Sequence, residues 1–392
     1  MRPRATRDMK RACGVGLMAL TPAILLGQAE RAYAEPQPTA MVEWLEPAVP
    51  ANQPQTPAQE AAAREHGRSL PTPEILQPTL DPALPVVRAC NNGALHGAFK
   101  GGSSDVLPGL VTLWIQRFNK YCPQVQISVS PPFAGSLGAK ELIKQNLDFV
   151  FVSRELRPDD IEEFTRKFGY APLSVPVSGG SYRHFGFLDS VGFFVHKDNP
   201  LERVTFQQLD AILSSTHHRG GAPVTVWGQL GLSGEWADKP IHVYALKPWN
   251  GFEEFVRQRV LSTSGKRGEW RADLNFERLV FPIAGRVARD RYGLGYTGLA
   301  FVDAGVKSLA VAQSENGPFY APSYGNVALA TYPLSRLIYF NVNRAPGRPL
   351  EPALAAFLHF ILSREGQQAV LDQAIYLPLR AAQAAQARAL ID

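Results

Sequence analysis

Residues 94–129 read ALHGAFKGGSSDVLPGLVTLWIQRFNKYCPQVQISV, and this stretch decides the fold. The spacing of its apolar residues predicts, in order, a strand, a Gly/Ser turn, a helix and a strand, over 94–99, 101–105, 106–121 and 125–129. The pattern then repeats, with a helix over 139–145 and a continuous apolar strand over 149–152. Strands that alternate with helices indicate a mostly parallel sheet, whose ligand site lies at the carboxyl ends of the strands.

Three polar segments follow predicted strands and are expected to meet at one edge of this sheet. They are Ser103-Ser104, Gly135-Ser136 and Ser153-Arg154. Two of them also open helices, where free backbone N–H groups favour an anion, and Arg154 offers bidentate contacts to an oxyanion. Each turn alone is equally well explained as a helix cap. The three together predict an anion site.

The rest of the chain predicts a second α/β unit inserted into the first. Further strands are expected over 191–195, 241–245 and 337–342, and further helices over 205–213, 252–261 and 352–373. We therefore expect an α/β protein with two lobes, two crossovers and a hinge, each lobe holding a mixed, mostly parallel sheet. The predicted lobes are 89–196 with 321–392, and 197–320.

The first 88 residues differ in composition from the rest of the chain. A basic start, an apolar stretch over 13–27 and Ala32-Tyr33-Ala34 are typical of a secretory signal cleaved after Ala34, and the alternative is a membrane anchor. Residues 35–88 hold 11 prolines and few large apolar side chains, which favours a disordered linker.

The formal net charge of +5 excludes few partners by itself. No run of Lys or Arg and no interleaving of basic and aromatic residues suggests nucleic acid, so we expect no nucleic-acid partner. A mild excess of positive charge would suit a small anion.

Specific motifs make the sequence similar to a known family. They are Gly102-Ser103-Ser104, Gly135-Ser136, residues 148–154, residues 196–201, Thr331-Tyr332-Pro333-Leu334-Ser335-Arg336, Leu362-Ser363-Arg364-Glu365-Gly366-Gln367 and Tyr376-Leu377-Pro378-Leu379. Over about residues 94–380 the chain resembles the periplasmic phosphate-binding proteins that serve ABC transporters. The resemblance implies the two-lobed periplasmic-binding-protein fold of type II.

The resemblance also implies a ligand site, and the chain departs from the family pattern in part of it. The implied residues are Ser103, Ser104, Asp105, Gly135, Ser136, Ser153, Arg154, Asn250 and Gly251. Many relatives have Thr where Asp105 stands, and an Arg followed by Ser-Gly-Thr where this chain has residues 246–251. Asp105 is interpreted either as an acceptor for the proton of hydrogen phosphate or as a cap of the next helix.

We therefore expect a solute-binding protein without enzymatic activity that captures an inorganic oxyanion, phosphate first, for an ABC permease. The expected protein is a diffusible monomer in the periplasm. The alternative is an envelope interaction protein of the same fold with a degenerate pocket, which the missing Ser-Gly-Thr favours.

Two motifs are set aside, so no cofactor or metal is expected. Residues 293–298 satisfy G-x-G-x-x-G, but a helix before them and an extended segment after them are the reverse of a dinucleotide site. His217-His218 lacks ligand partners at metal spacing. Cys90 and Cys122 are expected at the same edge of the first unit, where they form either a disulfide or two unrelated thiols.

Overall fold

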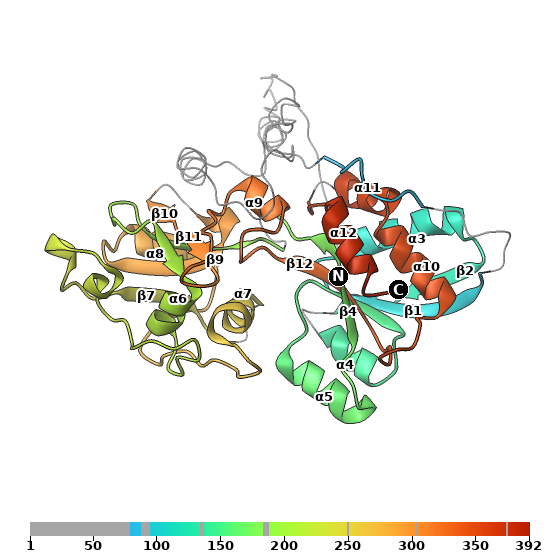
Figure 1. Ribbon diagram of the computed structural model, residues 1–392, viewed down its shortest axis with the longest axis horizontal. Coiled ribbons are helices and arrows are strands. Elements are labelled where there is room, and N and C mark those ends of the chain that lie inside the picture. The colour runs from blue at the N-terminus through green and yellow to red at the C-terminus, as the bar shows by residue number, and fades with distance from the viewer. Residues whose placement is uncertain are drawn as a thin grey trace, which may run out of the picture. The chain divides into compact units, whose positions relative to one another are not determined.

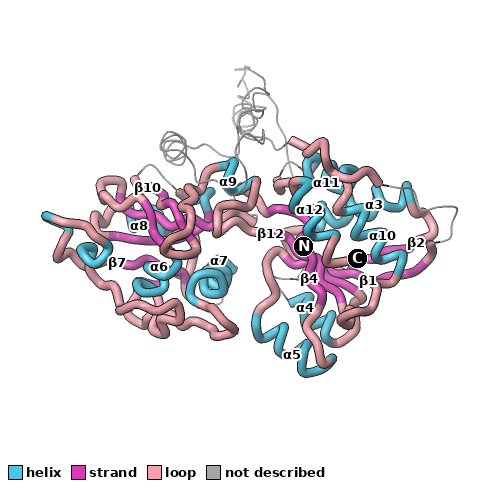
Figure 2. The backbone as a smooth tube through the Cα atoms, viewed as in Figure 1, coloured by secondary structure: helices cyan, strands magenta, loops and turns pink. Residues whose placement is uncertain are grey.

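Two five-stranded mixed sheets with helices around them make up the fold of this protein (Figures 1 and 2). The computed structural model describes residues 79–87, 95–133, 137–182, 188–248, 251–302, 305–373 and 375–392. The predicted signal over 1–34 and most of the predicted linker lie outside them. No helix among these residues has the length and apolar character needed to cross a membrane.

The first sheet has the strand order β2-β1-β3-β12-β4. Its strands are β1 (Gly97–Ser103), β2 (Val125–Val129), β3 (Phe149–Val152), β4 (Leu173–Gly179) and β12 (Leu337–Val342). β1 runs parallel to β2 and β3, whereas β12 is antiparallel to both β3 and β4. The last strand of the chain therefore enters the middle of the sheet.

Helices cover both faces of the first sheet (Figure 1). They are α3 (Pro108–Tyr121), α4 (Leu137–Ile143), α5 (Pro158–Phe168), α10 (Pro352–Ile361), α11 (Arg364–Asp372) and α12 (Ala381–Arg388). Phe149 and Phe151 of β3 pack in one apolar cluster with α3, α10, α11 and α12, while Val150 and Val152 pack in another with α4 and α5. Successive residues of a strand point to opposite faces, so a continuous apolar strand is expected here.

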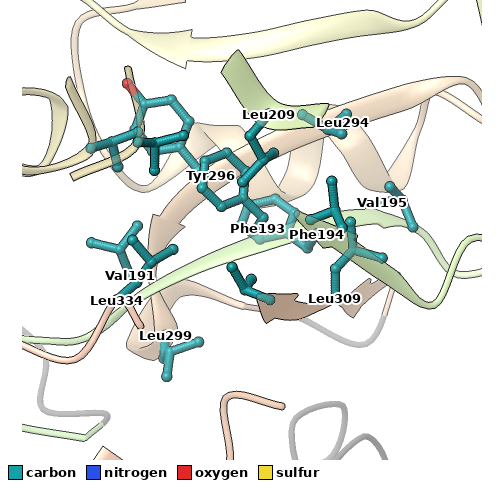
Figure 3. Close-up of a cluster of buried hydrophobic side chains, with 14 of the residues drawn as sticks. Val191, Phe193, Phe194, Val195, Leu209, Leu294, Tyr296, Leu299, Leu309 and Leu334 are labelled. Atoms are coloured by element: carbon teal, nitrogen blue, oxygen red, sulfur yellow. The ribbon is translucent and has the colours of Figure 1, made fainter. Parts of the chain in front are cut away.

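The second sheet has the order β10-β5-β9-β7-β8, beside a two-stranded sheet of β6 and β11. The strands are β5 (Val191–His196), β6 (Arg203–Thr205), β7 (His242–Leu246), β8 (Asn275–Glu277), β9 (Gly293–Gly298), β10 (Val306–Ser308) and β11 (Ala310–Ala312). The helices are α6 (Phe206–Leu213), α7 (Gly251–Val256), the π-helix η5 (Arg257–Leu261), α8 (Pro282–Ala288), α9 (Tyr324–Ala328) and the 3-10 turns η3 (Trp227–Leu230), η4 (Gly234–Trp236) and η6 (Leu299–Phe301). Their core contains Phe193, Phe194, Leu294 and Tyr296 (Figure 3).

Several elements have the predicted bounds, and three differ for physical reasons. β2, β3 and β12 match the predicted ranges. Gly101-Gly102-Ser103, predicted as a turn, is part of β1, because a Cβ on Gly101 would lie 2.2 Å from the ring of Phe149 and only glycine fits. The helix predicted over 352–373 is two helices, since Ser363 accepts a hydrogen bond from the Gly366 N–H and caps α11.

The G-x-G-x-x-G segment is itself the strand β9, and the segment after it, predicted as extended, begins with η6. A Cβ on Gly295 would lie 2.9 Å from Ile283 and Val287 of α8. The glycines therefore allow a helix to pack closely on the sheet and do not form a phosphate-binding turn.

The two halves divide the chain somewhat differently from the predicted lobes. β5, assigned above to the first lobe, pairs with β9 and β10 of the second sheet. Tyr324 and Tyr332, also assigned to the first lobe, pack in the core of the second sheet. Residues 79–87 of the predicted linker are docked on the first half, because Leu84 is 3% exposed within its apolar cluster.

Candidate anion-binding site

The ends of β1 and β3 bring buried hydroxyl groups together at one edge of the first sheet. The Ser104 N–H donates to the Phe151 carbonyl at 2.9 Å, which aligns the two strand ends. The Oγ atoms of Ser104 and Ser153 lie 3.4 Å apart, and the Ser104 hydroxyl also donates to Asp105 at 3.1 Å. Ser104 is only 1% exposed, and the buried Ser103 hydroxyl has no hydrogen-bond partner among the described residues.

Arg154 adds a buried positive charge to this edge. It follows Ser153 directly and is 6% exposed. Burial, and then the nearby charge of Arg157, lower the pKa of the Arg154 guanidinium from its ordinary value, while Glu254 of α7 opposes this shift. Glu254 is itself held by a bidentate ion pair with Arg267, at 2.8 Å to each oxygen. Positive charge therefore concentrates beside the serine hydroxyls.

A second arginine at the same edge was not among the predicted site residues. β12 is antiparallel to β3, with Tyr339 opposite Val152, so the residues just before β12 lie beside those just after β3. Ser335 and Arg336 occupy this position and are 5% and 7% exposed. The motif containing them was visible in the sequence, but their place beside Arg154 depends on strand register, which the sequence does not reveal.

The remaining predicted residues have different outcomes. Gly135, Ser136 and Asn250 lie outside the described residues, and Gly251 begins α7. Asp105 is exposed, and it is not the cap of the next helix, because the N-cap residue of α3 is Leu107. Cys122 is disulfide-bonded, and its predicted partner Cys90 lies outside the described residues.

A hollow of about 340 Å³ borders this region of the chain. Glu155, the residue after Arg154, lines it together with Arg259 and Lys266 from the segment that follows α7. Arg259 and Glu155 form an ion pair at 3.5 Å across it. Elsewhere in the described chain, no group of three or more His, Cys, Asp or Glu residues is arranged to hold a metal ion.

Comparison with known proteins places this fold in a class. A model of the PBP superfamily domain matches residues 88–365. The crystal structure of PstS from Borrelia burgdorferi superposes with a TM-score of 0.50 at 16% identity, over 73% of this chain and all of that one. The two-lobed type II fold of the periplasmic binding proteins is thus the fold of this chain.

The sequence relatives define the family more narrowly. The chain is 34% identical over 304 residues to the phosphate-binding protein PstS of Pseudomonas aeruginosa, which covers 77% of this chain and 88% of that protein. It is also 28% identical over 186 residues to protein SphX of a Synechocystis species, over 47% of this chain and 52% of that one. The chain belongs to the phosphate-binding protein family.

Proposed function

We propose that this protein is a phosphate receptor that binds the inorganic oxyanion at the edge of the first sheet. The observation that carries the proposal is the cluster of Ser104, Ser153 and Arg154, which lie together, buried, where β1 and β3 end. Hydroxyl groups and a guanidinium are the donors that an oxyanion requires. The names of the relatives support phosphate as the ligand. The predicted residues Gly135, Ser136, Asn250 and Gly251 belong to the same proposal.

We further propose that the protein acts in the periplasm as a monomer, delivers phosphate to an ABC permease and has no enzymatic activity. The predicted signal over 1–34 supports export, and the relatives named as phosphate-binding proteins support a role in capture. The proposed lobes are the two halves built on the two sheets, and the hinge consists of the crossings between them.

The deciding experiment is titration calorimetry of the exported chain with phosphate, arsenate, sulfate and molybdate. We expect heat with phosphate and arsenate, which have the same shape and protonation. Sulfate carries no proton near neutral pH, so it is expected to bind more weakly if Asp105 accepts a proton from the ligand. Absence of heat with all four anions would contradict the proposal and favour the interaction protein with a degenerate pocket.

Replacing Arg154 tests the site directly. Arg154→Ala removes a charge-assisted contact worth about 1.5–3 kcal/mol, so phosphate affinity should fall by about tenfold or more. Arg166→Ala on the exposed side of α5 removes the same charge and should leave the affinity unchanged. Equal affinities of the two variants would show that Arg154 does not contact the ligand.

A further inference from the structure

The guanidinium of Arg336 is buried without an acidic partner. Its side chain lies over the rings of Phe252 and Phe255 of α7, with 5.2 and 5.3 Å between the guanidinium carbon and the ring centroids. Its Nε has no hydrogen-bond partner among the described residues, although the residue is only 7% exposed. Aromatic faces attract a cation but cannot accept its N–H groups as oxygen atoms do.

Arg257 shows how this protein normally accommodates a buried arginine. It is also 7% exposed, and it donates to Glu253 at 2.7 Å and to Glu269 at 2.9 Å. A buried charge without a counter-charge costs several kcal/mol, so proteins rarely keep one unless it serves a purpose. The contrast with Arg257 indicates that the counter-charge of Arg336 is not part of the chain.

The two carboxylates nearest to Arg336 are engaged elsewhere. Glu155 accepts a hydrogen bond from the Tyr339 hydroxyl at 3.1 Å and pairs with Arg259. Asp189 accepts the backbone N–H of Ala300. Burial, and then the charge of Arg154, lower the pKa of Arg336 to about 9 in spite of both carboxylates. Arg154 and Arg336 are thus close enough to repel each other at the edge that holds Ser104 and Ser153.

We propose, on the basis of the anion site proposed above, that Arg336 is a second cationic ligand of the oxyanion and that the two arginines select doubly charged anions. A dianion between them would neutralise both guanidinium groups, whereas a monoanion would leave one charge uncompensated. The contact of Arg336 with Phe252 and Phe255 fixes the guanidinium in place before the ligand arrives, so little side-chain entropy is lost on binding.

The test compares Arg336→Met and Arg336→Lys with the wild-type chain, using inorganic phosphate as the probe. Phosphate is mainly a dianion at about pH 8 and mainly a monoanion at about pH 5.5. At the higher pH, Arg336→Met should lower the affinity by about tenfold or more, and Arg336→Lys should retain part of it. The preference of the wild type for the higher pH should become smaller in Arg336→Met. The control is Arg166→Met, which should bind as the wild type does.

Thermal unfolding separates a ligand contact from a purely structural role. The phosphate-free Arg336→Met chain should be at least as stable as the wild type, because a costly buried charge has been removed, while the stabilisation by phosphate becomes smaller. A less stable variant with unchanged affinity and unchanged pH preference would overturn the inference and leave the phosphate site intact. Absence of phosphate binding by the wild type would instead overturn the function and this inference together.

Discussion

Gln367 illustrates how one buried side chain can explain a sequence motif. Its amide donates to the carbonyls of Val177 and Ile361 at 2.9 and 2.8 Å and accepts the N–H of Leu379 at 2.6 Å. Val177 belongs to β4, the edge strand of the first sheet, so Gln367 satisfies a backbone group that no further strand pairs. The Leu-Ser-x-Glu-Gly-Gln motif thus protects a sheet edge and does not contact the ligand in this part of the structure.

Gln367→Leu should therefore destabilise the protein strongly. Three backbone groups would lose a partner at buried positions, and we expect a loss of about 3 kcal/mol in the free energy of unfolding. Urea unfolding measures this loss. Gln368→Leu is the matched control, because Gln368 is next in sequence and bonds Asp372 at an exposed position. A difference below about 1 kcal/mol between the two variants would contradict this role of Gln367.

Residues that follow parallel strands were the ones accessible to sequence reasoning. Ser104, Ser153 and Arg154 were predicted to lie together, because carboxyl ends of parallel strands share an edge. Arg336 comes before a strand, and it reaches the same edge only because β12 is antiparallel to β3. Nothing in the local pattern distinguishes an antiparallel insertion from a parallel one, so this residue could be quoted from a motif but not assigned to the site.

At the scale of elements, the close contact of β1 with β3 depends on glycine. Gly101→Ala would place a methyl group about 2 Å from the Phe149 ring, and Phe149 cannot move easily because it is stacked on Phe340 with 4.9 Å between ring centroids. We expect a loss of about 1–3 kcal/mol in the free energy of unfolding. Phosphate affinity should also fall, because β1 positions Ser104.

The control for this substitution is Gly285→Ala in α8. The nearest atoms to a Cβ at Gly285 are those of the flexible Arg289 side chain at 3.7 Å, so the added methyl group has space. Alanine favours a helix over glycine, and this variant should gain about 0.5–1 kcal/mol. Urea unfolding of both variants checks the pair, and equal effects would show that crowding at Phe149 does not matter.

Element boundaries were harder to predict than element types. The apolar spacing continues from α10 into α11, so periodicity alone predicted one helix over 352–373. The interruption arises because the Ser363 side chain competes with the helical backbone, donating to the Phe360 carbonyl at 2.6 Å and capping the next helix. Such side-chain competition is local and depends on angles that a sequence pattern does not contain.

At the scale of the whole molecule, a polar clamp joins residues 79–87 to the last helix of the first half. Asp81 accepts the N–H groups of Ala381 and Ala83, both at 3.0 Å, and pairs with Arg380 at 3.3 Å. Burial alone would raise the pKa of the Asp81 carboxyl, but these hydrogen bonds and the Arg380 charge outweigh it and lower the pKa below the ordinary value. The ionised carboxylate is therefore the stabilising form.

The sign of the pH dependence follows from this shift. A carboxyl with a lowered pKa stabilises the folded state at neutral pH, and the contribution is lost as the pH falls through its folded-state pKa. Asp81→Asn should cost about 1 kcal/mol at neutral pH and almost nothing at about pH 2.5. Urea unfolding at both pH values tests this, with exposed Asp238→Asn as the control. A constant difference at the two pH values would contradict the clamp.

The composition of the predicted linker concealed where folding begins. Eleven prolines and few large apolar residues over 35–88 predicted disorder to the end of that stretch. Leu80 and Leu84 nevertheless pack on the first half, and the Pro85 carbonyl accepts the Arg364 N–H at 2.8 Å. Average composition cannot identify two leucines whose burial depends on a surface contributed by residues nearly 300 positions later.

The docked segment also determines how the molecule would carry a mechanical load. Its contacts are with Arg364, Glu365, Arg380 and Ala381, which all belong to the first half. Tension applied upstream of Thr79 therefore passes into α11 and α12 and not into the crossings near Gly180 and Arg336. Anchoring the protein through its amino-terminal side would thus restrain one half while leaving the other without load. The affinity for the ligand should then be the same whether the protein is tethered or free.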